Sequence, residues 1–136
     1  MKIPELLSPV GNVEHLKIAV LAGASSVYLS GKNYGARKYA DNFTIEEINK
    51  SVEYAHMHNV KVYITVNTLI KEEELGECLK YVYELYSLGV DGVLIQDIGL
   101  MKLIHEFIPD FNIHASTQMN IENINEPEDL IYIIFT

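Results

Sequence analysis

The stretch LGVDGVLI at Leu88–Ile95 predicts the end of a helix, a turn at Gly89 and a short buried strand. The stretch AGASSVYL at Ala22–Leu29 repeats this order, with Gly23 at the turn, and HNVKVYI at His58–Ile64 is a looser copy. Because glycine readily adopts the left-handed conformation that ends a helix, the two glycines mark helix-to-strand boundaries. A repeated helix, turn and strand unit favours a parallel sheet with helices between its strands.

The hydrophobic pattern along the whole chain predicts five strands, near residues 3–7, 26–30, 61–66, 92–96 and 112–117. It predicts four helices, near residues 13–22, 45–58, 71–87 and 98–107. Capping residues support two boundaries, since Asn12 can cap the first helix and Thr44 with Glu47 forms a capping box before the second. The apolar run Leu130–Phe135 is either a sixth strand or an exposed tail.

The predicted fold class is therefore α/β, built from parallel (β/α) repeat units. Two architectures stay open, an open doubly wound sheet and part of a TIM-like barrel. A complete barrel needs about 250 residues, whereas this chain has 136. As a barrel it would be a truncated half-barrel of five to six strands. We expect residues 1–136 to form a single domain, with residues 121–136 as a divergent tail.

The composition is that of a globular chain, with 49% hydrophobic and 21% charged residues. The formal net charge of -9 disfavours direct nucleic-acid binding by this chain alone. The single cysteine, Cys78, excludes an intrachain disulfide and fits a reducing compartment. We see no secretory leader and no apolar run long enough to cross a bilayer, so we expect no membrane association and a cytoplasmic location.

The stretch FNIHASTQ at Phe111–Gln118 carries the most chemistry, at the end of the fifth predicted strand. Side chains alternate between the faces of a strand, so His114, Ser116 and Gln118 share one face. A serine needs a neighbouring base to become a nucleophile, which makes His114 and Ser116 a candidate catalytic pair. The alternative is a polar pocket lining, because spacing identifies no orienting acid. We predict a substrate-binding role for Gln118.

Other candidate residues follow the earlier predicted strands, at the edge where parallel α/β proteins build their sites. Asp97 is a candidate catalytic acid or base, and its alternative role is to cap the helix near Ile98. Arg37 is a candidate substrate-binding residue, because a guanidinium holds a carboxylate or phosphate through two parallel hydrogen bonds. Its alternative is a surface ion pair with Asp41. Asn67 is also predicted to bind substrate, and we assign no metal ligand.

Several motifs, taken in order along the chain, are similar to those of one family. They are ELLSPVGN at 5–12, GASSVYLSG at 23–31, Arg37, ADNF at 40–43, VKVYITVNT at 60–68, GVDG at 89–92 and HASTQMN at 114–120. The chain resembles the N-terminal part of the collagenase-like peptidases of unknown catalytic type, peptidase family U32. The resemblance covers residues 3–123.

The resemblance implies a TIM-barrel-like catalytic domain whose historical activity is proteolysis, so we expect a peptidase acting on a peptide or other small substrate. Some members instead serve oxygen-independent hydroxylation of RNA bases or of a quinone precursor, and this is one alternative. Members with an iron–sulfur cluster hold it through cysteines later in the chain, so the cofactor here stays unknown. A noncatalytic half-barrel is the other alternative. We expect a homo-oligomer, or a second half supplied separately.

Overall fold

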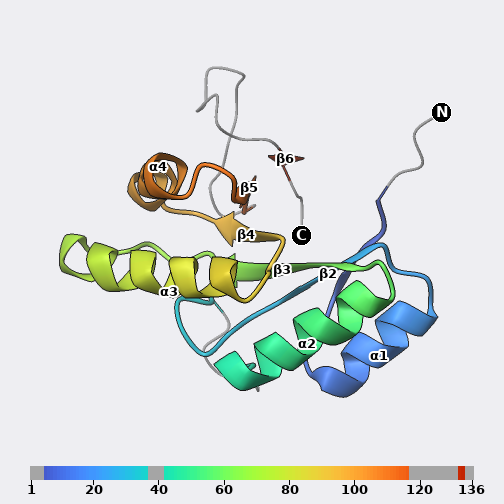
Figure 1. The fold of residues 1–136 in the computed structure, drawn as a ribbon. Coiled ribbons are helices and arrows are strands. Elements are labelled where there is room, and N and C mark those ends of the chain that lie inside the picture. The colour runs from blue at the N-terminus through green and yellow to red at the C-terminus, as the bar shows by residue number, and fades with distance from the viewer. Residues whose placement is uncertain (1–4, 37–41, 117–131, 134–136) are drawn as a thin grey trace.

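The computed structural model describes residues 5–36, 42–116 and 132–133 (Figure 1). The elements follow in the order β1 (Leu7–Pro9), α1 (Val13–Leu21), β2 (Ser26–Leu29), α2 (Ile45–Met57), β3 (Lys61–Val66), the 3-10 helix η1 (Glu72–Glu74), α3 (Leu75–Ser87), β4 (Gly92–Ile95), α4 (Ile98–Phe107), β5 (Asn112–Ala115) and β6 (Tyr132–Ile133).

The sheet has six parallel strands that stand in chain order from β1 to β6. Figure 1 shows helices α1 to α4 following one another around one side of these strands. A doubly wound sheet reverses its strand order and carries helices on both faces, so that alternative is wrong. The prediction of parallel (β/α) units in a TIM-barrel-like arrangement of five to six strands is confirmed.

The predicted boundaries hold for most elements, because local capping fixes them. The Asn12 side chain accepts a hydrogen bond from the His15 N–H at 2.8 Å. Thr44 and Glu47 form the expected capping box, with both hydrogen bonds at 3.1 Å. The first strand, predicted near residues 3–7, begins later than expected: β1 spans Leu7–Pro9, residues 5 and 6 precede it, and residues 3 and 4 lie outside the described residues. Its position is decided by pairing with β2, which its own sequence does not encode.

The apolar run near the end of the chain contributes to the sheet. Tyr132 and Ile133 form β6, which pairs in parallel with β5, so the sixth-strand alternative is confirmed for these two residues. The rest of the predicted tail 121–136 lies outside the described residues, as do Arg37, Asp41 and Gln118.

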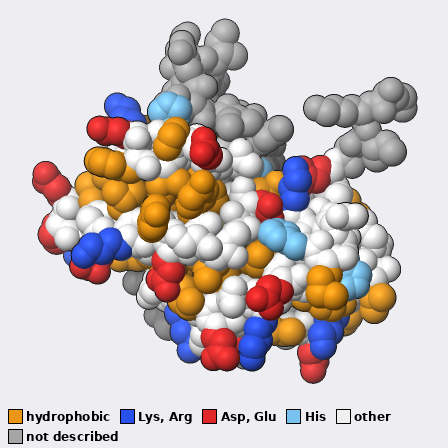
Figure 2. All heavy atoms as spheres, in the orientation of Figure 1, with side chains coloured by type: hydrophobic (Ala, Val, Ile, Leu, Met, Phe, Trp, Pro, Cys, Tyr) orange, Lys and Arg blue, Asp and Glu red, His pale blue; other side chains and the backbone are white. Residues whose placement is uncertain are grey.

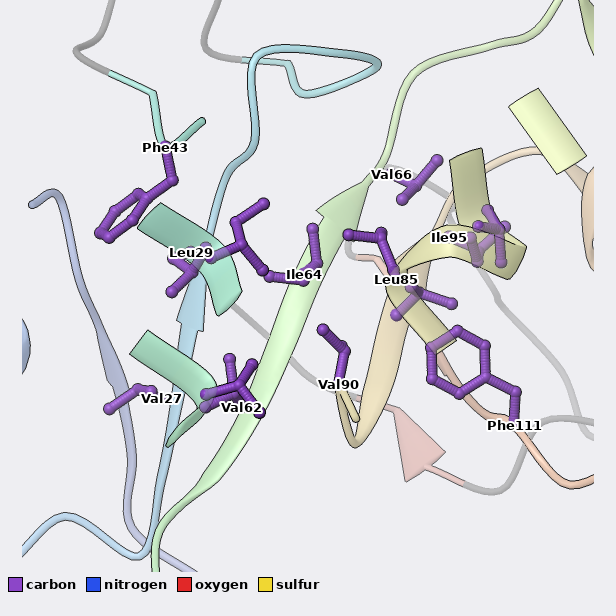
Figure 3. Packing of buried hydrophobic residues seen from close by; sticks show 14 of the residues in the cluster. Val27, Leu29, Phe43, Val62, Ile64, Val66, Leu85, Val90, Ile95 and Phe111 are labelled. Carbon is purple, nitrogen blue, oxygen red and sulfur yellow. The ribbon is translucent and has the colours of Figure 1, made fainter. Parts of the chain in front are cut away.

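The hydrophobic core lies between the sheet and its helices. Alternate side chains of the central strands point into it, and Figure 3 shows these aliphatic groups packed with helix residues such as Leu85. The strand residues of this helix-facing side are Val27, Leu29, Val62, Ile64, Val66, Val93, Ile95 and Ile113. Burying each such side chain contributes about 1.5–3 kcal/mol, so this layer supplies much of the stability.

The surface in Figure 2 mixes acidic and basic side chains, and hydrophobic groups gather over α3 and α4. Tyr83, Tyr86 and Phe107 are exposed there. Within the described part of the chain, none of the helices has the length and apolar character needed to cross a membrane. The predicted homo-oligomer stays a prediction.

Candidate functional site

The face of the sheet opposite the helices carries a different set of side chains, which we call the inner face. Register places Thr65, Leu94 and His114 side by side on β3, β4 and β5. Alternation along each strand puts the remaining members on the same side. The inner face comprises Tyr28, Ser30, Tyr63, Thr65, Leu94, His114 and Ser116.

His114 lies on this face at strand β5, beside Leu94 of β4, and is only 4% exposed. Its neighbour Ile113 points into the hydrophobic core, so His114 points away from the helices. Burial lowers the pKa of His114, while the Glu5 carboxylate acts in the opposite direction and Lys61 adds to the lowering. The imidazole is therefore neutral near pH 7, the form in which one ring nitrogen accepts a proton and the other donates one.

Tyr63 packs against His114, with ring centroids 4.4 Å apart and an interplanar angle of 42°. Its hydroxyl donates to a Glu5 carboxylate oxygen at 3.4 Å. Sequence reasoning missed Tyr63. The repeated unit places Tyr28 and Tyr63 at equivalent positions, and the two are paired in register, but this repeat does not indicate the contact with His114.

Ser116 lies just beyond β5, and its backbone N–H donates to the Ile95 carbonyl at 2.9 Å. This bond continues the ladder between β4 and β5, so the side chain keeps the alternation and shares the inner face with His114. Ser116 is 4% exposed. The nucleophilic role of Ser116 and the basic role of His114 stay predictions, as does substrate binding by Gln118.

Asp97 caps α4, which confirms the capping interpretation. One carboxylate oxygen accepts from the Leu100 N–H at 2.8 Å and the other accepts from the Ile70 N–H at 3.1 Å. The side chain thus fixes the start of α4 and the segment before η1 at the same time. A catalytic role for Asp97 stays a prediction, and it would compete with these two backbone hydrogen bonds.

Asn67 holds the segment that follows β2, because its side-chain oxygen accepts from the Ala36 N–H at 3.0 Å. Ser30 and Thr65 share a hydroxyl hydrogen bond of 2.5 Å beside this segment. Asn67 therefore shapes the carboxyl edge of the sheet by fixing a loop. Direct substrate contacts of Asn67 and Arg37 stay predictions.

Other reactive groups are poorly placed for chemistry. Burial, with Asp97 and Glu74 adding to it, raises the pKa of the Cys78 thiol to about 12, so the nucleophilic thiolate does not form near neutral pH. The residues that the structure describes include no cluster of three or more His, Cys, Asp or Glu side chains able to hold a metal ion. His56 instead pairs with the Asp91 carboxylate at 2.7 Å.

The fold and the ordered motifs define a (β/α) protein with polar chemistry on its inner face. This chain belongs to peptidase family U32, whose model matches residues 11–128. It is 40% identical over 122 residues to the tRNA hydroxylation protein P1 of Bacillus subtilis, covering 90% of this chain and 29% of that protein. It is 36% identical over 132 residues to the 23S rRNA 5-hydroxycytidine C2501 synthase of Escherichia coli, covering 97% and 20%.

The chain is also similar to a protein named as a collagenase and to a solved structure. The collagenase of Porphyromonas gingivalis is 36% identical over 121 residues, covering 88% of this chain and 28% of the relative. The solved structure of the U32 peptidase Mk0906 has a TM-score of 0.72 at 17% identity, covering 90% of this chain and 52% of that one. That likeness shows a shared fold. The chain thus spans less than a third of the curated relatives described here.

Proposed function

We propose that this chain contributes to the hydroxylation of a base in RNA. The observation that carries the proposal is the match along 97% of the chain to a protein named for making 5-hydroxycytidine in 23S rRNA. The match along 90% of the chain to a tRNA hydroxylation protein supports it. The peptidase activity expected from the resemblance has weaker support, although a relative is named collagenase.

The site chemistry is compatible with this proposal. The neutral imidazole of His114 accepts or donates a proton at a position enclosed by the inner face, and the hydroxyls of Thr65 and Ser116 provide hydrogen-bonding groups on the same face. A serine hydrolase needs in addition an acid that orients its histidine. The sequence identifies no such orienting acid, and Asp97, the candidate catalytic acid or base, has both oxygens engaged with backbone N–H groups.

Phosphate binding requires clustered Lys and Arg, and this chain has a net charge of -9. We therefore propose that the main RNA contacts are made by parts of the protein outside this chain. The relatives named for RNA hydroxylation are several times longer than this chain, and their remaining residues are the proposed source of those contacts.

A chimera tests the proposal. The matching segment of the B. subtilis tRNA hydroxylation protein P1 is replaced by this chain, and the chimera is expressed in a B. subtilis strain whose tRNA lacks the modification. We expect hydroxylated nucleosides to reappear in digested tRNA, measured by mass spectrometry. His114→Ala should lower the yield by at least about tenfold, the low end of general acid–base contributions. His58→Ala, an exposed histidine outside the site, is the matched control.

A soluble chimera at the normal cellular level that produces no hydroxylated nucleoside would contradict the proposal. The same purified chimera should then be incubated with collagen-derived peptides. Cleavage that is lost in both His114→Ala and Ser116→Ala would favour the peptidase, whose supporting observation is that these two residues share the inner face. A folded chimera inactive in both assays would favour the noncatalytic alternative.

A further inference from the structure

Two histidine–tyrosine ring pairs occur among the described residues, with similar geometry and different surroundings. His114 and Tyr63 lie 4.4 Å apart at 42°, and both are buried in the sheet. His58 and Tyr54 lie 4.7 Å apart at 43°, at the exposed end of α2. The surface pair is local, because side chains four residues apart on a helix lie next to each other. The buried pair joins β3 to β5, with β4 between them.

Gly92 explains how the buried rings meet across an intervening strand. It lies on β4 between Tyr63 and Asn112 in register. A Cβ atom there would come within 3.0 Å of the Tyr63 ring carbon Cδ1 and 2.8 Å of the Asn112 carbonyl oxygen. Real Cβ atoms essentially never come closer than 3.0 Å to another atom, so the Asn112 carbonyl oxygen excludes a side chain at this position, and a Cβ would also be tight against the Tyr63 ring. The absence of a side chain at Gly92 leaves open the space over β4 across which the tyrosine ring contacts His114.

We propose that Tyr63 is a positioning residue for His114, with its ring reaching across Gly92 and fixing the imidazole on the inner face. The inference rests on the proposed function only for the chemistry that His114 then performs. The ring contact, the burial and the gap at Gly92 stand independently of any activity.

The groups around His114 determine what a loss of Tyr63 would do. Glu5 reaches the site through the Tyr63 hydroxyl, and Lys61 lies on β3. On the other side, the backbone of β6 pairs with β5 at His114. The strand β4 presents Gly92 and Leu94, which carry no charge. Removing the ring admits water to the imidazole, and better hydration moves the pKa of a histidine up toward its ordinary value.

The test is an NMR titration of the full 136-residue chain with labelled histidine. We expect Tyr63→Ala to raise the midpoint of His114 by about half a pH unit or more. Tyr63→Phe keeps the ring and should leave the His114 midpoint close to that of the unmodified chain. Tyr54→Leu, which removes the ring of the exposed pair, is the matched control and should leave the His114 midpoint unchanged.

Tyr63→Leu covers the case in which the alanine variant does not fold. Leucine fills part of the space without an aromatic ring, so the His114 ring protons should lose the ring-current shift caused by Tyr63. They should also lose the one set of nuclear Overhauser contacts that reports a single fixed orientation of the imidazole. A folded Tyr63→Ala with the original midpoint, or a folded Tyr63→Leu with the original contacts, would overturn the inference. Neither readout depends on enzymatic activity, so a failure here is distinct from a failure of the proposed function.

Discussion

The two faces of the central strand β3 are buried to a similar extent and carry different chemistry. Within β3, Val62, Ile64 and Val66 point toward the helices, while Tyr63 and Thr65 point to the inner face. All five are at most 6% exposed. Burial alone therefore does not identify a stabilising core, because one strand supplies aliphatic packing on one face and hydrogen-bonding groups on the other.

The largest effect should come from the helix-facing side. Ile64→Ala removes a fully buried side chain and leaves a cavity, so we expect a loss of about 2–5 kcal/mol in the free energy of unfolding. Urea unfolding followed by circular dichroism measures it. Met57→Ala, at a side chain 81% exposed, should change the stability by less than about 0.5 kcal/mol. Similar losses of stability in both variants would contradict the claim that the helix-facing side of the sheet is the stabilising core.

Asp97 lies at the carboxyl edge, where the two faces end. Asp97→Ala removes the cap of α4 and should cost about 0.5–2 kcal/mol in urea unfolding. Asn is also a good capping residue, so Asp97→Asn should recover the contribution of the cap to Leu100, while its amide NH2 cannot accept from the Ile70 N–H. Measuring RNA hydroxylation by the chimera distinguishes a structural role of Asp97 from a catalytic one. If Asp97→Asn keeps both stability and activity, Asp97 is structural, and if it keeps stability while activity falls, the predicted catalytic role gains support.

A smaller effect is expected at the hydroxyl pair on the inner face. Thr65→Val keeps the shape of the side chain and removes the hydrogen bond to Ser30, which should cost about 0.5–1.5 kcal/mol. Ser30→Ala removes the other partner and should give a similar loss. The double variant should cost less than the sum of the two single changes, because the partners act as a unit. Strict additivity would show that the pair does not contribute.

The pH dependence of stability should also distinguish the faces, with the smallest effect. Burial lowers the pKa of His114 in the folded state below the ordinary value of about 6.5. Between these two values the unfolded chain binds more protons, so stability is lost as the pH falls below about 6.5. His114→Gln should flatten the slope of urea midpoints between about pH 5 and pH 7. Parallel slopes for both proteins would contradict a buried, neutral His114.

Much of the candidate site was predictable from strand alternation. His114 and Ser116 share the inner face because side chains two apart on a strand point the same way. The ring of Tyr63 was not predicted as part of the site, since a tyrosine in an apolar strand is ordinary core sequence. Its contact with His114 depends on a third strand, where Gly92 leaves space, and no local pattern reports that arrangement.

The sequence by itself determined the elements of this protein, because their signals are local. Gly23 and Gly89 end helices with φ angles of 93° and 90°, and Asn12 and Thr44 begin them through side-chain hydrogen bonds to nearby N–H groups. Repetition of these units was sufficient to predict a parallel α/β fold.

Only the tertiary structure decided the strand order, the start of β1, the double role of Asp97 and the meeting of Tyr63 with His114. Each depends on groups far apart in the chain that meet when the strands pair. The physical reason is that pairing satisfies backbone hydrogen bonds which are nearly identical for every strand. Register and order are therefore selected by how the side chains of neighbouring strands and helices pack.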